Sequence, residues 1–294
     1  MYLDVAAVRV HRAGRDRRVS SSEAVLLKVC RVLTMVLLCS DCANPQESVA
    51  TIIQRSVEAN NRDWDAAPWF DYTERDKEGN GTKTYAVTML YGSPYERLME
   101  VNGHRLSAEK EKEEEKKYEN AVAERRHEQP NKHAARIGKY EAERKRDRIL
   151  MEQLTKAFEF KLVGNEEVKG RKVYVLKATP LKGYRPPNRD SHVLTGMEGT
   201  MWIDQETFQW VKVEAHVTRP VRIQGFLAEV EPGTQFELEK TPVTPDVWLA
   251  THFSMKSNAR VMMLIPHRSQ EEIAYFDYHK ASGSTSGKNS GSGK

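Results

Sequence analysis

The chain has 294 residues, with 46 Lys and Arg against 42 Asp and Glu, so its net charge is +4. That length accommodates one large β domain or two smaller ones. Because charges of both signs are plentiful and no segment is purely basic, the composition argues against a nucleic-acid partner and indicates a soluble globular protein.

The N-terminal segment, residues 1–43, has the pattern of a secretory signal peptide. Lys28 and Arg31 precede a short apolar run, residues 32–38, which is followed by small residues up to Ala43. The run is shorter than the about 20 apolar residues that span a bilayer, so we expect cleavage near its end and release into the periplasm. Residues 1–23 are an unusually long, Arg-rich start, which indicates that translation begins further downstream.

All three cysteines, Cys30, Cys39 and Cys42, lie in this segment. The last two match C-x-x-C, but a redox motif of that type opens a helix in a βαβ unit, whereas this pair ends an export segment. A lipid anchor on a cysteine is the alternative, yet Leu38 and Asp41 stand where such processing requires a small residue. We therefore expect a soluble periplasmic domain without a disulfide.

The predicted domain, residues 44–280, begins with a helix and continues with strands. Apolar residues recur at helical spacing across residues 46–60, which predicts an amphipathic helix. Alternating residues then predict a meander of strands, with Gly and Asn supplying its tight turns. The strands are expected at residues 69–75, 83–91 and 95–101.

Residues 107–158 form a charged insertion that should fold as two helices. Ser107 is a suitable N-cap, and Pro130 separates the helices. We expect a helical hairpin that projects from the sheet. Its basic residues would suit an RNA- or membrane-binding arm, but the many Glu residues would repel phosphates, and pairs of opposite charge four residues apart favour a solvated helix.

A central hairpin is predicted at residues 199–217, after strands at 158–163 and 172–178 and a long loop at 180–198. Loops of that length are typically lids or mobile segments. Asp204 is suited to accept backbone N–H bonds in the hairpin turn. If residues 205–207 form the loop, Trp202 lies opposite Trp210 as a cross-strand aromatic pair.

Further strands are expected at residues 226–230, 235–240, 247–257, 260–266 and 272–278. Because few helices lie outside the insertion, these strands predict a mainly β (α+β) fold. We expect a large curved antiparallel sheet that forms an unclosed β-barrel covered by the N-terminal helix. Residues 281–294 are almost entirely Ser, Gly, Thr, Asn and Lys, which predicts a disordered tail.

The sequence offers no catalytic or metal-binding motif. Its histidines are scattered, without H-E-x-x-H, and a lone strand histidine such as His216 is more often a surface or packing residue than a ligand. Ser191 and His192 are adjacent, but a nucleophile and its base must meet in space beside a third group. A hydrolase that uses His192 or His216 is the alternative; we expect no enzyme activity, no cofactor and no metal.

The inner face of an incomplete barrel is apolar and needs a cover. The N-terminal helix and the 180–198 loop can cover part of it, and the remaining concavity is a natural site for an apolar ligand. For any one residue a place in a filled core is the simpler interpretation. The candidate lining residues are Trp69, Tyr85, Val87, Met89, Met201, Ile203, Val211 and Val213.

Two stretches carry a resemblance to a known family. Arg97-Leu98-Met99-Glu100-Val101-Asn102-Gly103 ahead of Leu106-Ser107, and Trp202-Ile203-Asp204 through Thr207 to Trp210-Val211-Lys212-Val213, resemble the bacterial outer-membrane lipoprotein-sorting (LolA/LolB-like) superfamily. The resemblance covers residues 46–280 and is greatest for members with a charged helical insertion after the third strand. It implies an unclosed barrel covered by helices, a cavity for the acyl chains of lipoproteins in transit, and no chemistry.

We therefore expect a monomeric, lipoprotein-carrier-like periplasmic protein that binds an acyl chain or another apolar ligand in the concave face of the sheet. The alternative is an envelope sensor or interaction module that does not transport, and that captures a partner protein through the charged helical hairpin. A sensor of mislocalised lipoproteins shares the superfamily fold, so the resemblance allows both.

Overall fold

A computed structural model of the chain describes residues 47–79, 81–222, 228–261 and 265–281. The predicted signal peptide with its three cysteines lies outside these residues, and so does the predicted tail apart from Ala281. Among the described residues, no helix combines the length and the apolar character needed to cross a membrane.

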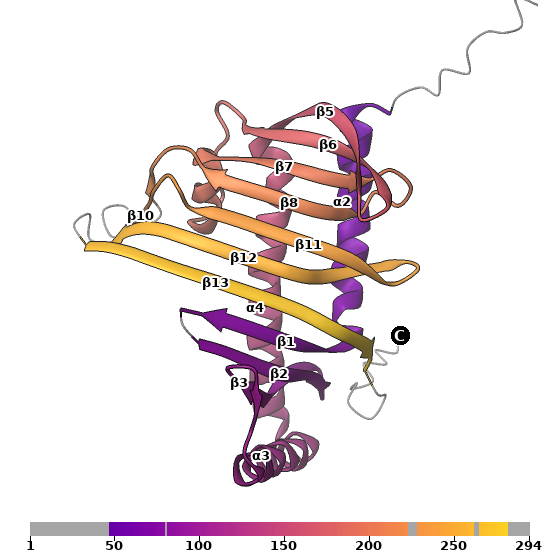
Figure 1. Cartoon of the computed structure of the whole chain (residues 1–294), viewed down its shortest axis with the longest axis vertical. Coiled ribbons are helices and arrows are strands. Elements are labelled where there is room, and N and C mark those ends of the chain that lie inside the picture. The colour runs from indigo at the N-terminus through magenta and orange to yellow at the C-terminus, as the bar shows by residue number, and fades with distance from the viewer. Residues whose placement is uncertain (1–46, 80, 223–227, 262–264, 282–294) are drawn as a thin grey trace, which may run out of the picture. The chain divides into compact units, whose positions relative to one another are not determined.

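The strands form one antiparallel sheet that does not close on itself (Figure 1). Its order is β4-β3-β2-β1-β13-β12-β11-β8-β7-β6-β5, and the short strands β9 and β10 are attached beside β12. Because the end strands β4 and β5 do not pair with one another, the predicted unclosed antiparallel sheet is confirmed. The strands are β1 (Phe70–Glu78), β2 (Gly81–Leu90), β3 (Ser93–Val101), β4 (His104–Arg105), β5 (Phe158–Val168), β6 (Arg171–Pro180), β7 (Met197–Asp204), β8 (Trp210–Val217), β9 (Val221–Arg222), β10 (Ala228–Val230), β11 (Gln235–Thr244), β12 (Val247–Val261) and β13 (Ile265–Lys280).

The long hairpin of β12 and β13 differs from the expected pattern. A separate strand at residues 260–266 is wrong, because the pairing of β12 with β13 continues without interruption from His252 to Val261. Asn258 and Ala259, which the expected pattern leaves between two strands, lie within β12 instead. The backbone N–H of Asn258 donates to Thr234 Oγ1 at 3.0 Å, and its carbonyl accepts from the N–H of Glu231 at 2.8 Å.

The predicted helix at residues 46–60 forms as α2 (Val49–Ala66), which begins three residues later than expected and ends six residues beyond the expected end. Ser48 caps it, with its Oγ accepting from the N–H of Thr51 at 3.1 Å. Its buried stripe contains Ile52 and then mostly small or polar residues: Ser56, Ala59, Asn60 and Asp63. A short 3₁₀ turn, η1 (Ala67–Trp69), leads from the helix into β1.

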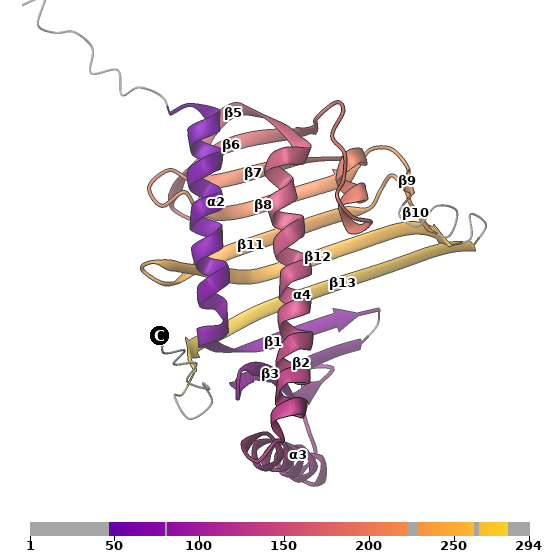
Figure 2. The same ribbon diagram turned by 180° about the vertical axis from the view of Figure 1, so that it is seen from behind.

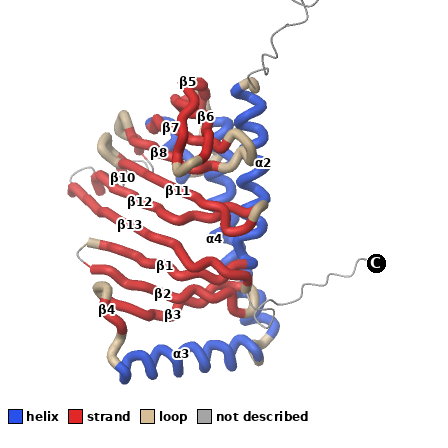
Figure 3. Tube along the Cα trace, turned by 45° about the vertical axis from the view of Figure 1, so that its right-hand side comes forward, coloured by secondary structure: helices blue, strands red, loops and turns tan. Residues whose placement is uncertain are grey.

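The charged insertion forms α3 (Ala108–Arg126) and α4 (Pro130–Ala157), as predicted. Ser107 caps α3, and Pro130 occupies the first turn of α4. The projecting hairpin, however, is wrong. Figures 2 and 3 show α3 along the β3 edge and α4 crossing the strands beside α2, on the same face of the sheet. We call this the helix-covered face.

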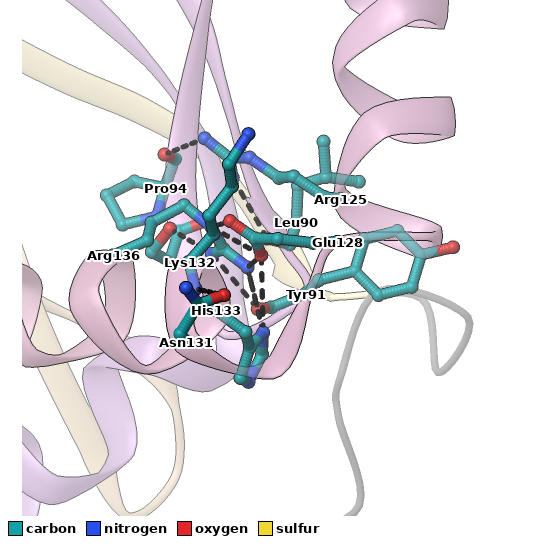
Figure 4. A network of polar contacts seen from close by, with 10 residues as sticks. Leu90, Tyr91, Pro94, Arg125, Glu128, Asn131, Lys132, His133 and Arg136 are labelled. Carbon is teal, nitrogen blue, oxygen red and sulfur yellow. Dashed lines mark hydrogen bonds and ion pairs between the residues drawn. The ribbon is translucent and has the colours of Figure 1, made fainter.

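A polar network fixes the corner between α3 and α4 to the β2–β3 turn (Figure 4). Arg125 donates to the carbonyl oxygen of Ser93 at 3.0 Å, and Arg136 donates to Ser93 Oγ at 2.7 Å and to the carbonyl oxygen of Tyr91 at 3.2 Å. Arg136 also pairs with Glu128 Oε2 at 2.7 Å. These bonds explain why an almost wholly polar insertion follows the sheet instead of extending into solvent.

Replacing Arg136 with Met should lower the free energy of unfolding by about 1–3 kcal/mol, because Glu128 and Ser93 lose a charged partner. It should also expose residues 127–129 to proteases. Urea denaturation and limited proteolysis measure both effects. Lys139→Met, at an exposed position one turn along α4, is the matched control. Equal stability of the two variants would contradict the role given to the network.

The predicted long loop, residues 180–198, also packs on the helix-covered face. It contains the 3₁₀ helix η2 (Asp190–Gly196), whose Leu194 is buried against Ala157 and Phe158. The Tyr184 hydroxyl donates to Gln153 Oε1 at 3.1 Å. The loop therefore covers one end of the face, between α4 and the edge of the sheet.

Candidate functional site

The central hairpin forms from β7 and β8, and Asp204 shapes its turn as expected. Its Oδ1 accepts from the backbone N–H groups of Glu206 and Thr207 at 3.1 and 2.8 Å. The expected pairing of Trp202 with Trp210 is wrong, because Trp202 pairs with Lys212 and Ile203 pairs with Trp210.

A longer turn explains the shift of register in this hairpin. The loop extends to Gln209 and contains Phe208 in the left-handed region, at φ 60°. The resulting irregularity turns Trp210 onto the helix-covered face, where it joins Ile52 of α2 and Ile203 in the main core cluster. Trp202 remains on the other face, and its indole N–H donates to Glu166 Oε2 at 2.9 Å.

An apolar cavity of about 250 Å³ lies between α2, α4 and the strands of the helix-covered face. We call it the aromatic cavity, because Trp and Tyr side chains dominate its wall. One of its walls, Trp64, is held by Arg144 of α4, whose guanidinium stacks over the indole at 4.6 Å and donates to the Trp64 carbonyl oxygen. The lining residues are Asn60, Asp63, Trp64, Ala67, Tyr72, Met151, Trp210, Leu238, Lys240, Trp248, Leu249, Ala250, Tyr275 and Tyr278.

A buried polar cluster stands at the α2 side of the aromatic cavity. The Lys240 ammonium donates to Asp63 Oδ2 at 2.6 Å and to Asn60 Oδ1 at 2.9 Å. Asp63 Oδ1 accepts from Gln209 Nε2 at 3.0 Å and from the backbone N–H of Trp248 at 2.9 Å. Asp63 is 3% exposed and Lys240 is 9% exposed, so the pair is well shielded from water.

The cluster joins α2 to strands β11 and β12 and to the turn between β7 and β8. Burial lowers the pKa of Lys240 below its usual range, and the neighbouring Asp63 carboxylate opposes this shift. Both oxygens of the Asp63 carboxylate accept hydrogen bonds, so neither is left without a partner. A charged pair of this kind fixes the position of α2 over the sheet, since separating either partner leaves a charge unpaired in an apolar surrounding.

Three tyrosines form the opposite wall of the aromatic cavity. The Tyr72 ring lies 5.9 Å from that of Tyr275 and 5.4 Å from that of Tyr278. Burial raises the pKa of all three hydroxyls, so they remain neutral. The Tyr278 hydroxyl donates to the Ala250 carbonyl oxygen at 2.7 Å. The wall thus presents aromatic faces, with little free charge.

Glu74 of β1 pairs with Tyr275 and lies beside this wall. Burial raises the pKa of its carboxyl from the ordinary value of 4.5 to about 7, and repulsion from Glu96, Asp76 and Glu271 adds to the shift. Its carboxyl is therefore partly protonated at neutral pH.

The raised pKa of Glu74 predicts a pH-dependent stability. Between pH 4.5 and about 7 the folded chain binds a proton that the unfolded chain has released, so the free energy of unfolding should fall as pH rises through this window. Glu74→Gln should flatten the slope, whereas Glu159→Gln, at an exposed position on β5, should keep it. Urea denaturation across the window tests this. An unchanged slope in Glu74→Gln would contradict the assignment.

The structure places the sequence-predicted lining residues in several surroundings. Met201, Ile203 and Val213 belong to the core cluster beneath α2, and Val211 packs with Val173, Val175 and Trp248. Val87 and Met89 are buried in β2, Tyr85 is half-buried beside them, and Trp69 is 61% exposed. None of the eight is among the lining residues of the aromatic cavity, so their role as ligand contacts stays a prediction.

The residues that do line the aromatic cavity left a weak signal in the sequence. Asn60 and Asp63 continue the helical spacing of the α2 stripe, and polar residues on an otherwise apolar helix face indicate a buried partner. Lys240 gave no such signal, because a lysine in an alternating strand is ordinarily solvent-facing.

A second apolar recess lies at the other end of the two helices. This groove has a volume of about 700 Å³ and lies between the first half of α2, the C-terminal part of α4 and β5. Its apolar contacts come mainly from Val49, Ile53 and Val57 of α2 and from Phe160 of β5. Both recesses border α2 and α4, and the core cluster around Ile52 also packs beneath these helices.

Within the described part of the chain, no three His, Cys, Asp or Glu side chains are placed to hold a metal ion. Ser191 Oγ donates to Asn188 Oδ1 at 2.7 Å. That contact within the loop provides no base and orienting acid for a nucleophile.

Comparisons with known proteins found similar solved structures only, since no family model and no curated protein matches the chain. A LolA superfamily protein from Nitrosomonas europaea is 13% identical, with 80% of this chain and 94% of that chain covered and a TM-score of 0.30. A DUF1329 family protein from Desulfovibrio piger is 10% identical, with coverages of 81% and 95% and a TM-score of 0.30.

A putative outer membrane lipoprotein-sorting protein domain from Vibrio parahaemolyticus is 13% identical, with 78% of this chain and 94% of that chain covered and a TM-score of 0.26. The superfamily expected from the sequence is therefore represented among the similar structures. Because identities and TM-scores are low, we base the function on the residues of this chain.

Proposed function

We propose that this protein is a periplasmic carrier-like protein that binds an acyl chain or a similarly apolar ligand between its two long helices and the sheet. The observation that carries the proposal is the aromatic cavity beneath α2 and α4. Apolar, largely preformed recesses with a few polar groups are the usual form of small-ligand sites. The export-type segment at residues 28–43 supports the periplasmic location.

The sizes of the recesses set what could bind. A volume of about 250 Å³ is just below the roughly 300–1,000 Å³ of typical ligand sites, so the aromatic cavity suits a short apolar ligand or one segment of a longer chain. The larger groove beside Val49 and Phe160 offers a second apolar surface under the same helices. A long acyl chain that used both recesses would need the packing beneath α2 to shift.

Nile red titration and solvent extraction test the proposal. The mature domain, purified from a bacterial envelope, should carry an extractable apolar compound, and the stripped protein should bind Nile red with a blue-shifted emission. Apolar acyl compounds should displace the dye. A protein that is consistently free of lipid and that gives no dye binding would contradict the proposed function.

The docking alternative rests on α3, which has no buried residue and is rich in charged side chains. Because α4 covers the cavity, deleting the insertion would disturb both functions at once. Reversing the exposed charges of α3 at Glu111 and Glu113 separates them. Ligand binding should persist in that variant, whereas capture of an envelope partner would be lost if α3 were the docking surface.

A further inference from the structure

One buried donor in the wall of the aromatic cavity has no acceptor. Trp210 is 6% exposed, and its indole Nε1 is fully buried without a hydrogen-bond partner among the described residues. Buried N–H groups are rarely left unpaired, because each one costs free energy that an acceptor would recover. The same side chain lines the cavity. Because this nitrogen has no exposed surface, an oxygen atom of a bound molecule would satisfy it once the side chains that enclose it shift.

Lys240 supplies a second donor in the same cavity. Its ammonium carries three N–H groups, and two of them are used by Asp63 and Asn60 at 2.6 and 2.9 Å. No third partner is found among the described residues. The polar side chains on this wall therefore leave donors to spare, in a recess whose remaining surface is mostly aromatic and aliphatic.

The charges select the kind of acceptor. Among the lining residues, Lys240 is the only cation and Asp63 is the only anion, and the two already neutralise each other. A bound carboxylate would add an uncompensated negative charge to a poorly hydrated site, which is costly. A neutral carbonyl oxygen accepts the same hydrogen bonds without that cost.

We infer that the aromatic cavity recognises a neutral carbonyl group attached to an apolar chain, as in an acyl ester or amide, in preference to a free fatty acid. The carbonyl oxygen accepts from the Trp210 indole N–H, and Lys240 is the second donor. This inference rests on the proposed function, because it names the ligand class of the same site.

Displacement of Nile red by three matched ligands tests the inference: undecane, methyl decanoate and decanoic acid at a pH where the acid is ionised. The ester should bind roughly tenfold more tightly than the alkane, the effect of one buried hydrogen bond that would otherwise be unmade. The ester should also bind more tightly than the acid. Equal affinities of ester and alkane, or an acid that binds more tightly, would overturn the inference.

Two tryptophan variants localise the effect. Trp210→Phe should reduce ester affinity roughly tenfold and leave alkane affinity unchanged. Trp202→Phe is the matched control, because that indole lies on the other face and donates to Glu166; ester affinity should be unchanged. Unchanged ester affinity in Trp210→Phe would overturn the inference.

The outcomes separate the inference from the proposed function. Binding of all three ligands without a preference leaves the proposed function standing and removes the carbonyl preference. If neither the dye nor any of the three ligands binds, both the proposed function and the inference are wrong. If Trp210→Phe does not fold, the relative affinities of the unaltered protein for ester, alkane and acid still test the carbonyl preference.

Discussion

Replacing Asp63 with Asn should lower the free energy of unfolding by about 3–5 kcal/mol, the largest effect we expect from a single side chain. The change is nearly isosteric, so the bonds from Gln209 and Trp248 can persist. The Lys240 ammonium, however, loses the carboxylate that lies 2.6 Å from it. An unpaired ammonium at a site this deeply buried must either remain charged at high cost or release its proton. Urea denaturation of the purified domain measures the loss.

A second substitution should reverse much of that loss. In Asp63→Asn combined with Lys240→Met, neither partner is charged, and the flexible methionine can fill the space of the lysine stem. The double variant should therefore be more stable than Asp63→Asn alone, and the coupling should be evident in a double-mutant cycle. Additive losses from the two single variants would show that the pair does not act as a unit.

Filling the aromatic cavity should abolish ligand binding while the fold persists. Ala250→Trp places an indole in a recess of about 250 Å³, so Nile red affinity should fall at least tenfold. The cost in stability should stay within about 3 kcal/mol, since overpacking typically destabilises a protein by about 1–3 kcal/mol. Dye titration and thermal denaturation measure the two effects on the same sample.

Ala135→Trp is the matched control for this variant. It introduces the same side chain on α4 at an exposed position, away from the residues that line the cavity. Its affinity for Nile red should equal that of the unaltered protein. If Ala250→Trp also binds the dye normally and is folded, the aromatic cavity is not the binding site, and the groove beside Phe160 becomes the next candidate.

Local sequence patterns were sufficient to predict the elements whose structure is determined by neighbouring residues. The alternation around Met201 and Ile203 predicts the central hairpin, and Asp204 does accept the backbone N–H bonds of its turn. Ser107 likewise caps α3 as expected. In each case the residues that determine the structure lie within a few positions of one another, so the sequence pattern contains the whole cause.

The position of α4 could not be predicted in this way. Most of its length shows no apolar stripe, which is ordinarily the sign of a solvated helix, and only its C-terminal end carries apolar residues that pack in the core clusters, Leu150, Met151 and Leu154. The bonds from Arg136 to Tyr91 and from Arg144 to Trp64 connect residues that are 45 and 80 positions apart. Arginines that bind backbone carbonyl oxygens leave no periodic pattern in the sequence. The part of a helix that packs through them therefore has the same sequence pattern as a solvated helix.

The aromatic cavity could not be predicted from the sequence either, because the residues that form it are far apart in the chain. Lys240 and Asp63 are 177 positions apart, and their pairing depends on the order of strands in the sheet. Trp210 faces the cavity because of an irregularity in one hairpin, and strict alternation places it on the other face. The predicted lining therefore consisted mainly of apolar residues from regular strands, and in the structure Met201, Ile203, Val211 and Val213 pack in the core clusters instead.

Photolabelling with an acyl ester that carries a diazirine at the end of its chain tests the central claim most directly. After irradiation and digestion, the label should map to peptides that contain Trp64, Met151 or Leu249, which line the aromatic cavity. An excess of unlabelled ester should prevent the reaction. Labelling confined to exposed apolar residues such as Val163 and Leu181, or labelling that the unlabelled ester does not prevent, would show that no ligand binds beneath the two helices.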